Sequence, residues 1–454
     1  MSLLAADIND AAITLLGRDA IVYREPGVAL LDDAELTTGA AAYRNARIHP
    51  RRVHTRFWSE LGTEALKVRR FEHLTAADLV SRQLEQLWRV ASADGDRLVV
   101  AVPAYMTTEQ LALFLGICNE LGIPVAAMVD AAVAATRRQY VDAQPLHVDI
   151  SLHSALLTRL RQGDRVQVES SAVVEDSGLF ALYDAWIRAI ADAFVQQSRF
   201  DPLHTAATEQ LLLDRLPGWL TDAAAGGKVG LQIDYQGIDH RAELDALSLI
   251  DAAAPVYQRI VSQLRTLCRA DETPALQLTD RVAVLPGLAD MLKARVGGDV
   301  FLLESGATAR GLVTRCRDMR AGGQVSLIRQ LPWDQSPVHV TVSDAGAGGG
   351  RPTHVLLDNT AYRIGAKPLN VGSQTADAGR WIGLDAEMPG VSRKHCTIQL
   401  ENGQCVVRDE SRYGTFLNGH RIDGSAVLQV GDLLRLGTPG YELRLIAVEG
   451  EDGT

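Results

Sequence analysis

Two aspartates, Asp7 and Asp149, are the first candidates for chemistry, because each follows a short apolar run and is placed to end a strand. Carboxylate oxygens are the ligands that hard cations such as Mg²⁺ take in proteins. The pair therefore fits a magnesium site. The simpler interpretation is that both are acidic residues at strand ends, and we favour it. We predict no bound metal and no cofactor.

Other reactive side chains do not form a recognisable catalytic group. The stretch 48–61 (IHPRRVHTRFWSEL) is basic and aromatic, which is more often a solvated face than a binding site. The five cysteines are scattered, with no CxxC pair and no metal-ligand spacing. No nucleophile, base and orienting residue can be assembled from the sequence. We therefore predict that the protein is not an enzyme.

Composition narrows the class of protein. A chain of 454 residues predicts two or three compact units. Its net charge of -11 argues against a nucleic-acid surface over the whole molecule, because phosphate backbones require basic patches. No segment approaches the roughly 18 apolar residues of a membrane helix. The odd number of scattered cysteines and the absence of a basic, apolar start favour the cytoplasm.

The elements of the first 331 residues predict an α/β architecture. Short runs at 3–7, 11–16, 20–23 and 28–31 are separated by turn residues, which is typical of a β-meander. Residues 146–171 predict a second meander, and the two together hint at a duplicated half. Between and after them, apolar strands alternate with helical patterns. The expected elements include strands at 98–102, 125–129, 230–235, 282–285 and 300–302, and helices at 107–121, 131–140, 253–269 and 305–319.

The composition changes near residue 332. Residues 332–352 contain Pro332, Pro337 and the run DAGAGGGRP (344–352), which cannot pack a core and predicts a flexible linker. Beyond it, residues 353–448 are short alternating runs punctuated by Gly, Asn and Asp. That pattern is typical of an all-β sandwich. The chain is therefore expected to be multidomain, with an α/β body at 1–331, a linker at 332–352 and a sandwich at 353–448.

Four sequence blocks in the sandwich occur together, in order, at compatible spacing. They are PLNVGS (368–373), VSRKH (391–395), DESRYGTFLNG (409–419) and VGDLLRLG (430–437). With these blocks residues 353–448 resemble the forkhead-associated (FHA) family, whose β-sandwiches bind phosphothreonine peptides. The expected partner is thus a protein phosphorylated on threonine by a Ser/Thr kinase. A phosphothreonine carries nearly two negative charges, so its site needs hydroxyl and backbone donors and at least one guanidinium.

The resemblance assigns roles to individual residues. Ser392 would donate to the phosphate, Arg393 and Arg412 would contact phosphate or peptide, and Tyr413 stands where the family often has an Asn that holds the peptide main chain. The residues expected to hold the loops in place are Gly372, His395, Gly414, Asn418 and Gly419.

One position departs from the family pattern. Ser373 stands where the family has an arginine, and the loop between it and Ser392 is longer than usual. Arg380, within that loop, is a candidate substitute. The alternative is that the phosphate is no longer required and that the module binds an unphosphorylated partner.

Residues 1–330 resemble the actin-like ATPase superfamily, nearest to DnaK-type chaperones and MreB-type actins, which implies a two-lobed, ribonuclease-H-like fold. The longest matching stretch is VVAVPAYMTTEQ (99–110) with LGICNELGIPVAAMVDAAVAA (115–135). Weaker blocks match an early strand pair, second-lobe helices, and an adenosine-side strand and helix. They are YREPGVALLD (23–32), HRAELDAL (240–247) with PVYQRIVSQL (255–264), and VAVLPGLADML (282–292) with ESGATARGL (304–312).

The nucleotide-binding motifs of that superfamily are degenerate here. The first phosphate turn keeps Asp7 but has Asn9 where glycine is expected, followed by a second carboxylate at Asp10. The second turn keeps Asp149 and loses all of its glycines. Gly287 is what remains of a Gly-Gly pair, and Asp130 replaces the glutamate of the Glu-Pro-Thr motif. Only glycine lets backbone N–H groups approach phosphate closely, so this pattern predicts a site that does not bind ATP.

These features favour a non-enzymatic adaptor, in which an ATP-incompetent actin-like body docks one partner and the FHA module reads another. Two alternatives remain: a divergent ATPase regulated through the FHA module, and a filament-forming bacterial actin homologue. Measuring ATP hydrolysis by the purified protein distinguishes the adaptor from the ATPase. Sedimentation with and without nucleotide distinguishes the adaptor from the filament-forming protein. The sequence does not specify an oligomeric state.

Overall fold

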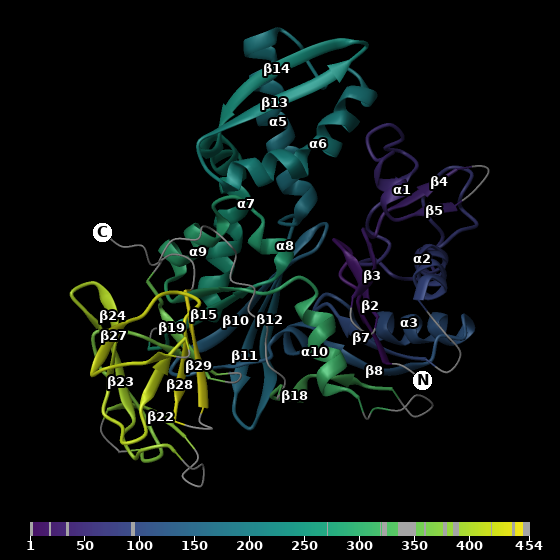
Figure 1. The fold of residues 1–454 in the computed structure, drawn as a ribbon. Helices are drawn as coiled ribbons and strands as arrows, with labels where there is room; N and C mark the ends of the chain where they lie inside the picture. Colours follow the sequence, from purple (N-terminus) through teal and green to yellow (C-terminus); the bar gives the residue numbers. More distant parts are fainter. Residues whose placement is uncertain are drawn as a thin grey trace. The chain divides into compact units, whose positions relative to one another are not determined.

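The structure, a computed structural model, describes residues 3–17, 20–32, 36–91, 96–269, 271–317, 319, 325–334, 351–357, 360–375, 379–384, 390–418, 420–437 and 441–447. It consists of a mixed α/β N-terminal region and a β-rich C-terminal region (Figure 1). Two compact units can be separated. The first comprises Met1–Thr136, Pro145–Gly298 and Leu302–Pro332, and the second comprises Arg137–Gln144, Asp299–Phe301 and Trp333–Thr454.

A six-stranded sheet lies at the centre of the first half of the N-terminal unit. Its strand order is β17-β8-β7-β1-β2-β3. The first three strands form an antiparallel meander, and β1, β7, β8 and β17 run parallel. Central strands buried on both faces require continuous apolar runs, which LVVAV at 98–102 supplies. The strands are β1 (Leu3–Asp7), β2 (Ile13–Leu16), β3 (Ile21–Glu25), β7 (Arg97–Val102), β8 (Val125–Asp130) and β17 (Leu327–Ile328).

A second sheet repeats this arrangement. Strands β10, β11 and β12 form another antiparallel meander, with β15 beside β10 as β7 lies beside β1, and β18 joins the far edge. The two predicted meanders are thus both present, β1-β2-β3 at one edge of the first sheet and β10-β11-β12 inside the second. The strands are β10 (Gln144–Ile150), β11 (Ser154–Gln162), β12 (Arg165–Glu175), β15 (Pro274–Leu278), β16 (Asp299–Leu302) and β18 (Gln330–Pro332).

An insertion follows each meander (Figure 1). The first contains α1 and a three-stranded sheet in the order β5-β4-β6, so residues 28–31, predicted as a fourth meander strand, belong to a separate sheet. The second contains α5, α6 and α7 with the hairpin β13–β14. Residues 240–245, expected on a helix, lie on β14. The elements are β4 (Ala29–Leu31), β5 (Leu36–Thr38), α1 (Ala40–Tyr43), β6 (Val53–His54), α5 (Leu179–Ser198), α6 (Ala206–Ala224), β13 (Lys228–Tyr235), β14 (Ile238–Asp245) and α7 (Ala246–Leu267).

The remaining helices pack on the sheets. Helix α3 begins where predicted, because Thr107 and Gln110 form a capping box that satisfies its first N–H groups. Helix α4 stops at Ala135, earlier than predicted, and the Arg315 guanidinium hydrogen-bonds the carbonyls of Val133 and Thr136 at its end. The helices are α2 (Ala76–Ala91), α3 (Thr108–Glu120), α4 (Ala131–Ala135), α8 (Asp280–Ala283), α9 (Leu288–Val296) and α10 (Ala307–Arg315).

One strand prediction is wrong in a way that matters for function. Residues 282–285 were expected as a buried strand, but the strand is β15 at Pro274–Leu278, all of it buried. Thr279 then begins a single helical turn, α8, which contains Asp280 and Arg281. Apolar residues occupy both segments, and an apolar run of this length does not distinguish strand from helix.

The C-terminal unit contains two sheets of short strands, drawn in green and yellow in Figure 1. One has the order β26-β25-β28-β29-β19-β20-β9 and the other β22-β21-β23-β24-β27. Buried residues of both sheets, such as Val371 and Leu443, belong to one core. The strands are β9 (Gln139–Tyr140), β19 (His354–Leu357), β20 (Thr360–Arg363), β21 (Leu369–Gly372), β22 (Arg380–Gly383), β23 (Cys396–Glu401), β24 (Gln404–Asp409), β25 (Thr415–Leu417), β26 (His420–Arg421), β27 (Ser425–Val427), β28 (Leu433–Leu436) and β29 (Tyr441–Ile446).

The boundary between the regions differs from the prediction. Pro332, expected as the first linker residue, ends β18 and pairs with Arg165 of β12. Residues 335–350, which make up most of the predicted linker, lie outside the described residues. Residues 137–144 and 299–301, expected in the N-terminal body, group with the C-terminal unit, where β9 pairs with β20.

Candidate functional site

Three loops of the C-terminal unit meet at one end of strand β21. The Ser373 N–H donates to the carbonyl of Ser392 (3.1 Å) and the Gln374 N–H to that of Arg393 (3.1 Å), which joins the end of β21 to the segment 391–395. A Cβ on Gly372 would lie 2.1 Å from the Arg393 carbonyl oxygen, closer than any carbon can approach. Glycine is therefore required here so that the two backbones can touch.

His395 connects this segment to the loop 410–415. Its buried ring accepts a hydrogen bond at Nδ1 from the Ser392 N–H (3.1 Å) and reaches the Gly414 carbonyl with Nε2 (3.2 Å). The second contact requires the tautomer with the proton on Nε2. Burial lowers the pKa of His395, which favours the neutral ring that this geometry needs. His395 thus braces two loops and has both ring nitrogens occupied.

The side chains expected to contact a phosphopeptide lie on the outside of the braced loops. Ser392 Oγ accepts a hydrogen bond from the Arg412 N–H (3.0 Å), and its own O–H proton remains available to a ligand. Arg393 and Arg412 are exposed, and Tyr413 is 56% exposed. The two joined loops thus carry one hydroxyl and two exposed guanidinium groups. This donor set matches a phosphate group.

A second network within the loop 409–415 was missed by the sequence reasoning. Asp409 Oδ1 accepts hydrogen bonds from the Ser411 N–H (3.0 Å) and the Thr415 hydroxyl (2.9 Å), while the Gly414 N–H donates to Ser411 Oγ (2.7 Å). Burial alone would raise the pKa of Asp409, but these hydrogen bonds lower it. The sequence does carry one signal for this network: Asp409 lies two residues before Ser411, and an Asp at that spacing favours an Asx turn.

The remaining predicted residues are Asn418 and Gly419, expected to hold the loops, and the candidate substitute Arg380. Asn418 has a φ of 50° and its side chain bonds Asp432 Oδ1 (2.7 Å) and the Leu433 N–H (2.9 Å). Gly419 lies outside the described residues. Arg380 begins β22, which pairs in parallel with β21, opposite Leu369. It is therefore at the end of β21 away from Ser373, and the structure does not bring it to the loops.

Comparison with protein-family models identifies the region that contains these loops. Residues 371–437 match the model described as the FHA domain. The C-terminal unit contains an FHA domain. A search of curated proteins found no match to the chain. The family match spans β21 to β28 and includes Gly372, Ser392, His395 and Gly414, so the loop surface described above belongs to the FHA domain.

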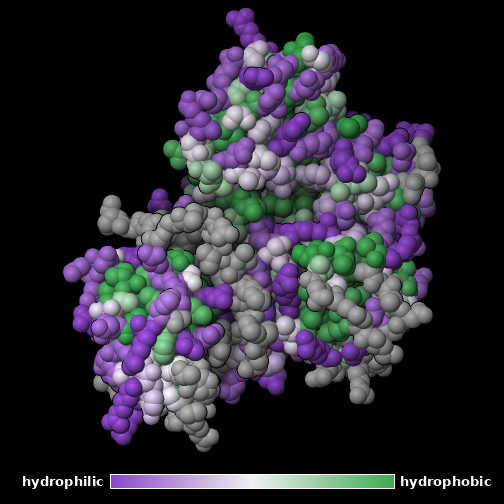
Figure 2. All heavy atoms as spheres, in the orientation of Figure 1, coloured by the Kyte–Doolittle hydropathy of each residue, from purple (hydrophilic) through white to green (hydrophobic). Residues whose placement is uncertain are grey.

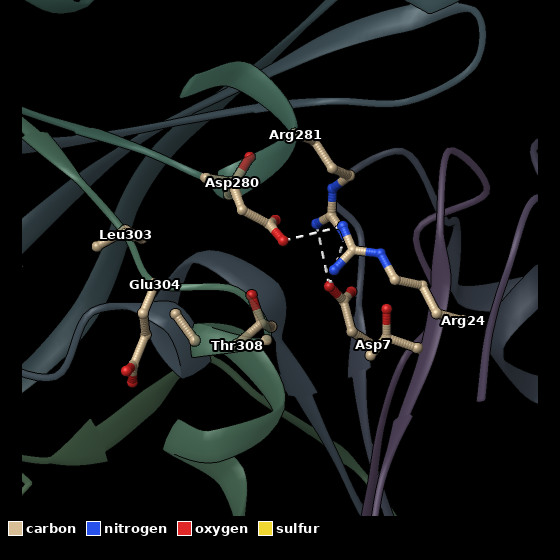
Figure 3. Close-up of a pocket in the computed structure, with 11 residues that line it drawn as sticks. Asp7, Arg24, Asp280, Arg281, Leu303, Glu304 and Thr308 are labelled. Carbon is tan, nitrogen blue, oxygen red and sulfur yellow. Dashed lines mark hydrogen bonds and ion pairs between the residues drawn. The ribbon is translucent and has the colours of Figure 1, made fainter. Parts of the chain in front are cut away.

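Outside the FHA domain, a second candidate site lies where strands β1 and β10 end. Asp7 and Asp149 do come together there, and the guanidinium of Arg281 lies between them. Figure 3 shows Asp7 and Arg281 of this group. Arg281 donates to Asp7 Oδ2 through both terminal nitrogens (3.0 Å each) and to Asp149 through Nη2 (2.8 Å) and Nε (3.0 Å). All three side chains are at most 6% exposed. Sequence reasoning missed Arg281, because it was expected to precede a strand.

Further polar groups complete this buried network. Asn9 Nδ2 donates to Asp149 Oδ2 (2.9 Å) and to the Ile150 carbonyl (3.0 Å), and the Thr279 hydroxyl donates to Asp149 Oδ1 (2.6 Å). Burial alone would raise the pKa of Asp149, but Arg281 and the Thr279 hydroxyl lower it to about 2. The ends of β1 and β10 are thus joined through the ion pairs of Arg281 with both carboxylates and through these hydrogen bonds.

Asp10 is the exception in this network. Its Oδ1 accepts the Leu152 N–H (2.8 Å), while its Oδ2 is buried with no hydrogen-bond partner among the described residues. Burial raises its pKa to about 7, well above the ordinary 3.8 of an aspartate. The carboxyl is therefore partly protonated near neutral pH.

The remaining space beside this network is small. The cavity lined by Asp7, Arg24, Asp280, Arg281, Thr308 and their neighbours has a volume of about 10 Å³ (Figure 3), which is room for about one water molecule. Pockets for drug-sized ligands are about 300–1,000 Å³. Arg24 forms an ion pair with Asp280 (2.9 Å) at its edge. The cavity beside Asp7 is much smaller than such a pocket.

The other residues of the predicted nucleotide site lie elsewhere. Asp130 caps α4, where its Oδ1 accepts the N–H groups of Ala132 (3.0 Å) and Val133 (3.4 Å). Gly287 precedes α9 with a φ of +72°, and a Cβ there would meet Ile250 at 2.8 Å. Both therefore have structural explanations, and neither lines the cavity beside Asp7.

Two wider searches of the described residues also bear on function. Among them no group of three or more His, Cys, Asp or Glu side chains is placed to hold a metal ion. Within the same part of the chain, every helix is too short or too polar to cross a membrane. The positive charge between Asp7 and Asp149 is the guanidinium of Arg281.

Proposed function

We propose that the protein is an adaptor that binds a threonine-phosphorylated protein through its FHA domain. The observation that carries this proposal is the surface formed by Ser392, Arg393 and Arg412. One hydroxyl and two guanidinium groups lie on loops whose backbones are fixed by Gly372 and His395. Because the loops are held by internal hydrogen bonds, binding does not require them to be ordered first. Donors that are already held in place lose less conformational entropy when a ligand binds.

The absence of the family's arginine at Ser373 does not remove every cation from the surface. Arg380 lies at the far end of β21, so the positive charge for the phosphate comes from Arg393 and Arg412. A hydrogen bond to a charged group contributes about 1.5–3 kcal/mol. Two such bonds are sufficient to make binding strongly dependent on the phosphate.

A peptide library tests this proposal. The full chain is screened against peptides that carry threonine, phosphothreonine or phosphoserine at the same central position. We expect selective retention on phosphothreonine peptides, and we expect Ser392→Ala and Arg412→Gln to lose it. Retention that is independent of the phosphate would indicate an unphosphorylated partner and overturn the proposal.

We further propose that the N-terminal unit is an actin-like body that does not bind ATP and that docks another protein. Its two sheets share the order of meander and adjoining strand, which supports a duplicated, two-lobed fold. Arg281 supports the loss of nucleotide binding, because its guanidinium occupies the space between the two strand-end carboxylates. A non-enzymatic role in the cytoplasm is part of this proposal.

Calorimetric titration of the full chain with Mg²⁺-ATP tests the nucleotide part. We expect no binding at millimolar nucleotide and no hydrolysis above the buffer rate. Micromolar affinity would show that Arg281 moves out of the cleft and would refute this part of the proposal, without affecting the test of the FHA domain.

A further inference from the structure

The hairpin β13–β14 of the second insertion is a separate two-stranded sheet, drawn in teal in Figure 1. Its turn residues Gln236 and Gly237 have φ values of 54° and 78°, and positive φ at both positions is what a type I′ turn requires. Helix α6 packs against one face of β13, and Val229, Leu231 and Ile233 are buried on that face. The apolar side of the strand is thus already covered within the chain.

The two edges of this hairpin differ in how their backbone groups are paired. On β14 the Glu243 N–H donates to Gln197 Oε1 (2.8 Å), and Gln197 Nε2 donates to the Glu243 carbonyl (2.7 Å). Both backbone groups of Glu243 therefore point away from β13 and towards α5. Gly230 lies directly opposite Glu243, so the two form a pair without mutual hydrogen bonds. The N–H and C=O groups of Gly230 consequently point to the outer edge of β13.

This outer edge is open. Backbone groups alternate in direction along a strand, so those of Lys228, Gln232 and Asp234 point outwards together with those of Gly230. All four residues are exposed, and none of their backbone groups bonds to another described residue. A Cβ added to Gly230 would meet nothing within 4 Å. An exposed row of unpaired N–H and C=O groups is a template for pairing with another strand.

The residues along this edge are complementary to themselves when the strand is reversed. With Leu231 of two copies opposite each other in an antiparallel pair, Lys228 faces Asp234 and Gly230 faces Gln232. All four of these residues point their backbone groups outwards, so each facing pair is able to exchange both of its N–H···O bonds. Such a contact is isologous, because both copies contribute the same residues.

The charges of the hairpin favour the same register. Asp234 lies directly opposite Asp239 in its own chain, and like charges at such positions are destabilising. Asp239 pairs with Arg241 (2.6 Å), whereas Asp234 forms no ion pair with any described residue. Lys228 contacts Glu243 of its own chain, and in the reversed pair it also faces Asp234 of the second copy. A lysine on an edge strand ordinarily discourages pairing, but in this register each lysine meets a carboxylate.

We propose that the protein forms a dimer in which the outer edges of two β13 strands pair about Leu231. The product is a continuous antiparallel sheet in the strand order β14-β13-β13-β14. Its centre is held by backbone hydrogen bonds, and one ion pair between Lys228 and Asp234 lies on each side of the symmetry axis. A dimer also carries two FHA domains in one particle, which allows bivalent binding.

Sedimentation velocity of the phosphatase-treated full chain, measured over a series of protein concentrations, tests the proposal. The phosphatase removes association through phosphorylated copies and the FHA domain. We expect a monomer–dimer equilibrium that Gln232→Pro weakens at least tenfold, because proline has no N–H group to donate across the edge. The matched control is Arg241→Pro, which should leave dimerisation unchanged. Arg241 lies directly opposite Gln232, so neither proline removes a hydrogen bond within the hairpin, but the N–H of Arg241 points to the other edge.

Charge reversal provides a second test. Lys228→Glu and Asp234→Lys should each weaken dimerisation at least tenfold, because like charges then face each other in the pair of identical chains. An equimolar mixture of these two variants should form dimers again, since every facing pair in the mixed dimer joins opposite charges. Melting curves establish that each variant is folded, and Gln232→Pro remains as the test if a charge variant does not fold.

Three results would overturn the proposal. The first is a wild-type chain that stays monomeric at every concentration, which would leave an extended segment of a different protein as the strand that this edge accepts. The second is a dimer that Gln232→Pro weakens no more than Arg241→Pro does, which would place the contact elsewhere on the molecule. The third is a mixture of the two folded charge variants that does not recover dimerisation.

Discussion

Removing Arg281 should destabilise the N-terminal unit strongly. In Arg281→Met, Asp7 and Asp149 stay buried with no counter-charge, while the packing volume is largely kept. In the native protein Arg281 and its neighbours keep the pKa of Asp149 at about 2, against the ordinary 3.8, which alone corresponds to about 2 kcal/mol at pH 7. Breaking a buried ion pair from one side costs about 3–5 kcal/mol. We expect a loss in that range.

Urea unfolding followed by tryptophan fluorescence measures this loss. Four of the six tryptophans, at 58, 88, 186 and 219, belong to the N-terminal unit and report on it. The loss should be largest near pH 7.5 and smaller near pH 4, where the uncompensated carboxyls can take up protons. Arg188→Met, at an exposed position on α5, is the matched control and should change the free energy of unfolding by less than about 0.5 kcal/mol. A loss below about 1 kcal/mol for Arg281→Met would refute the argument.

Three further outcomes are expected. Burial raises the pKa of Asp10 to about 7, so the native protein loses stability as the pH rises from about 4 to 7. Asp10→Asn removes this loss, and it should stabilise the protein by about 2–3 kcal/mol more at pH 8 than at pH 5. His147 is buried with both ring nitrogens unpartnered within the described part of the chain, and burial lowers its pKa to about 4. Lowering the pH from 6.5 to 5 should therefore reduce the free energy of unfolding by about 2 kcal/mol, because His147 can take up a proton only in the unfolded chain. The variant His147→Leu should not show this loss. Gly372→Ala should displace the Arg393 backbone and lower phosphopeptide affinity at least tenfold.

Each of these three variants has its own measurement and its own refuting result. Urea titrations at the stated pH values test the first two. A pH-independent effect of Asp10→Asn, or an unchanged acid dependence in His147→Leu, would show that these groups do not titrate as argued. For Gly372→Ala, the control is Gly403→Ala, since a Cβ at Gly403 meets nothing within 4 Å although its φ is +81°. Equal affinities of the two variants would exclude the proposed backbone clash.

Local patterns predicted much of the fold. The apolar run at 98–102 and the Thr107–Gln110 capping box depend on neighbouring residues, so β7 and α3 were expected where they occur. The four blocks of the FHA domain were also recognisable, because turn and loop residues at fixed spacing carry that signal. The strand predicted at 282–285 failed, since a short apolar run fits both a strand and a helix.

The decisive contacts of the candidate sites were not predictable in the same way. Arg281 acts on Asp7, 274 positions away, and on Asp149, 132 positions away. Nothing near Arg281 in the sequence indicates that its side chain is buried. Arg380 was a candidate substitute for the arginine missing at Ser373, but it lies opposite Leu369, because β22 pairs in parallel with β21. That pairing is a tertiary feature, and no local pattern specifies it.

The most direct test of the account is the affinity of the full chain for one selected peptide in two forms, with and without a phosphate on its threonine. We predict that the phosphorylated form binds at least tenfold more tightly, and that Ser392→Ala removes most of this difference. Equal affinities of the wild-type chain for the two forms would contradict the account.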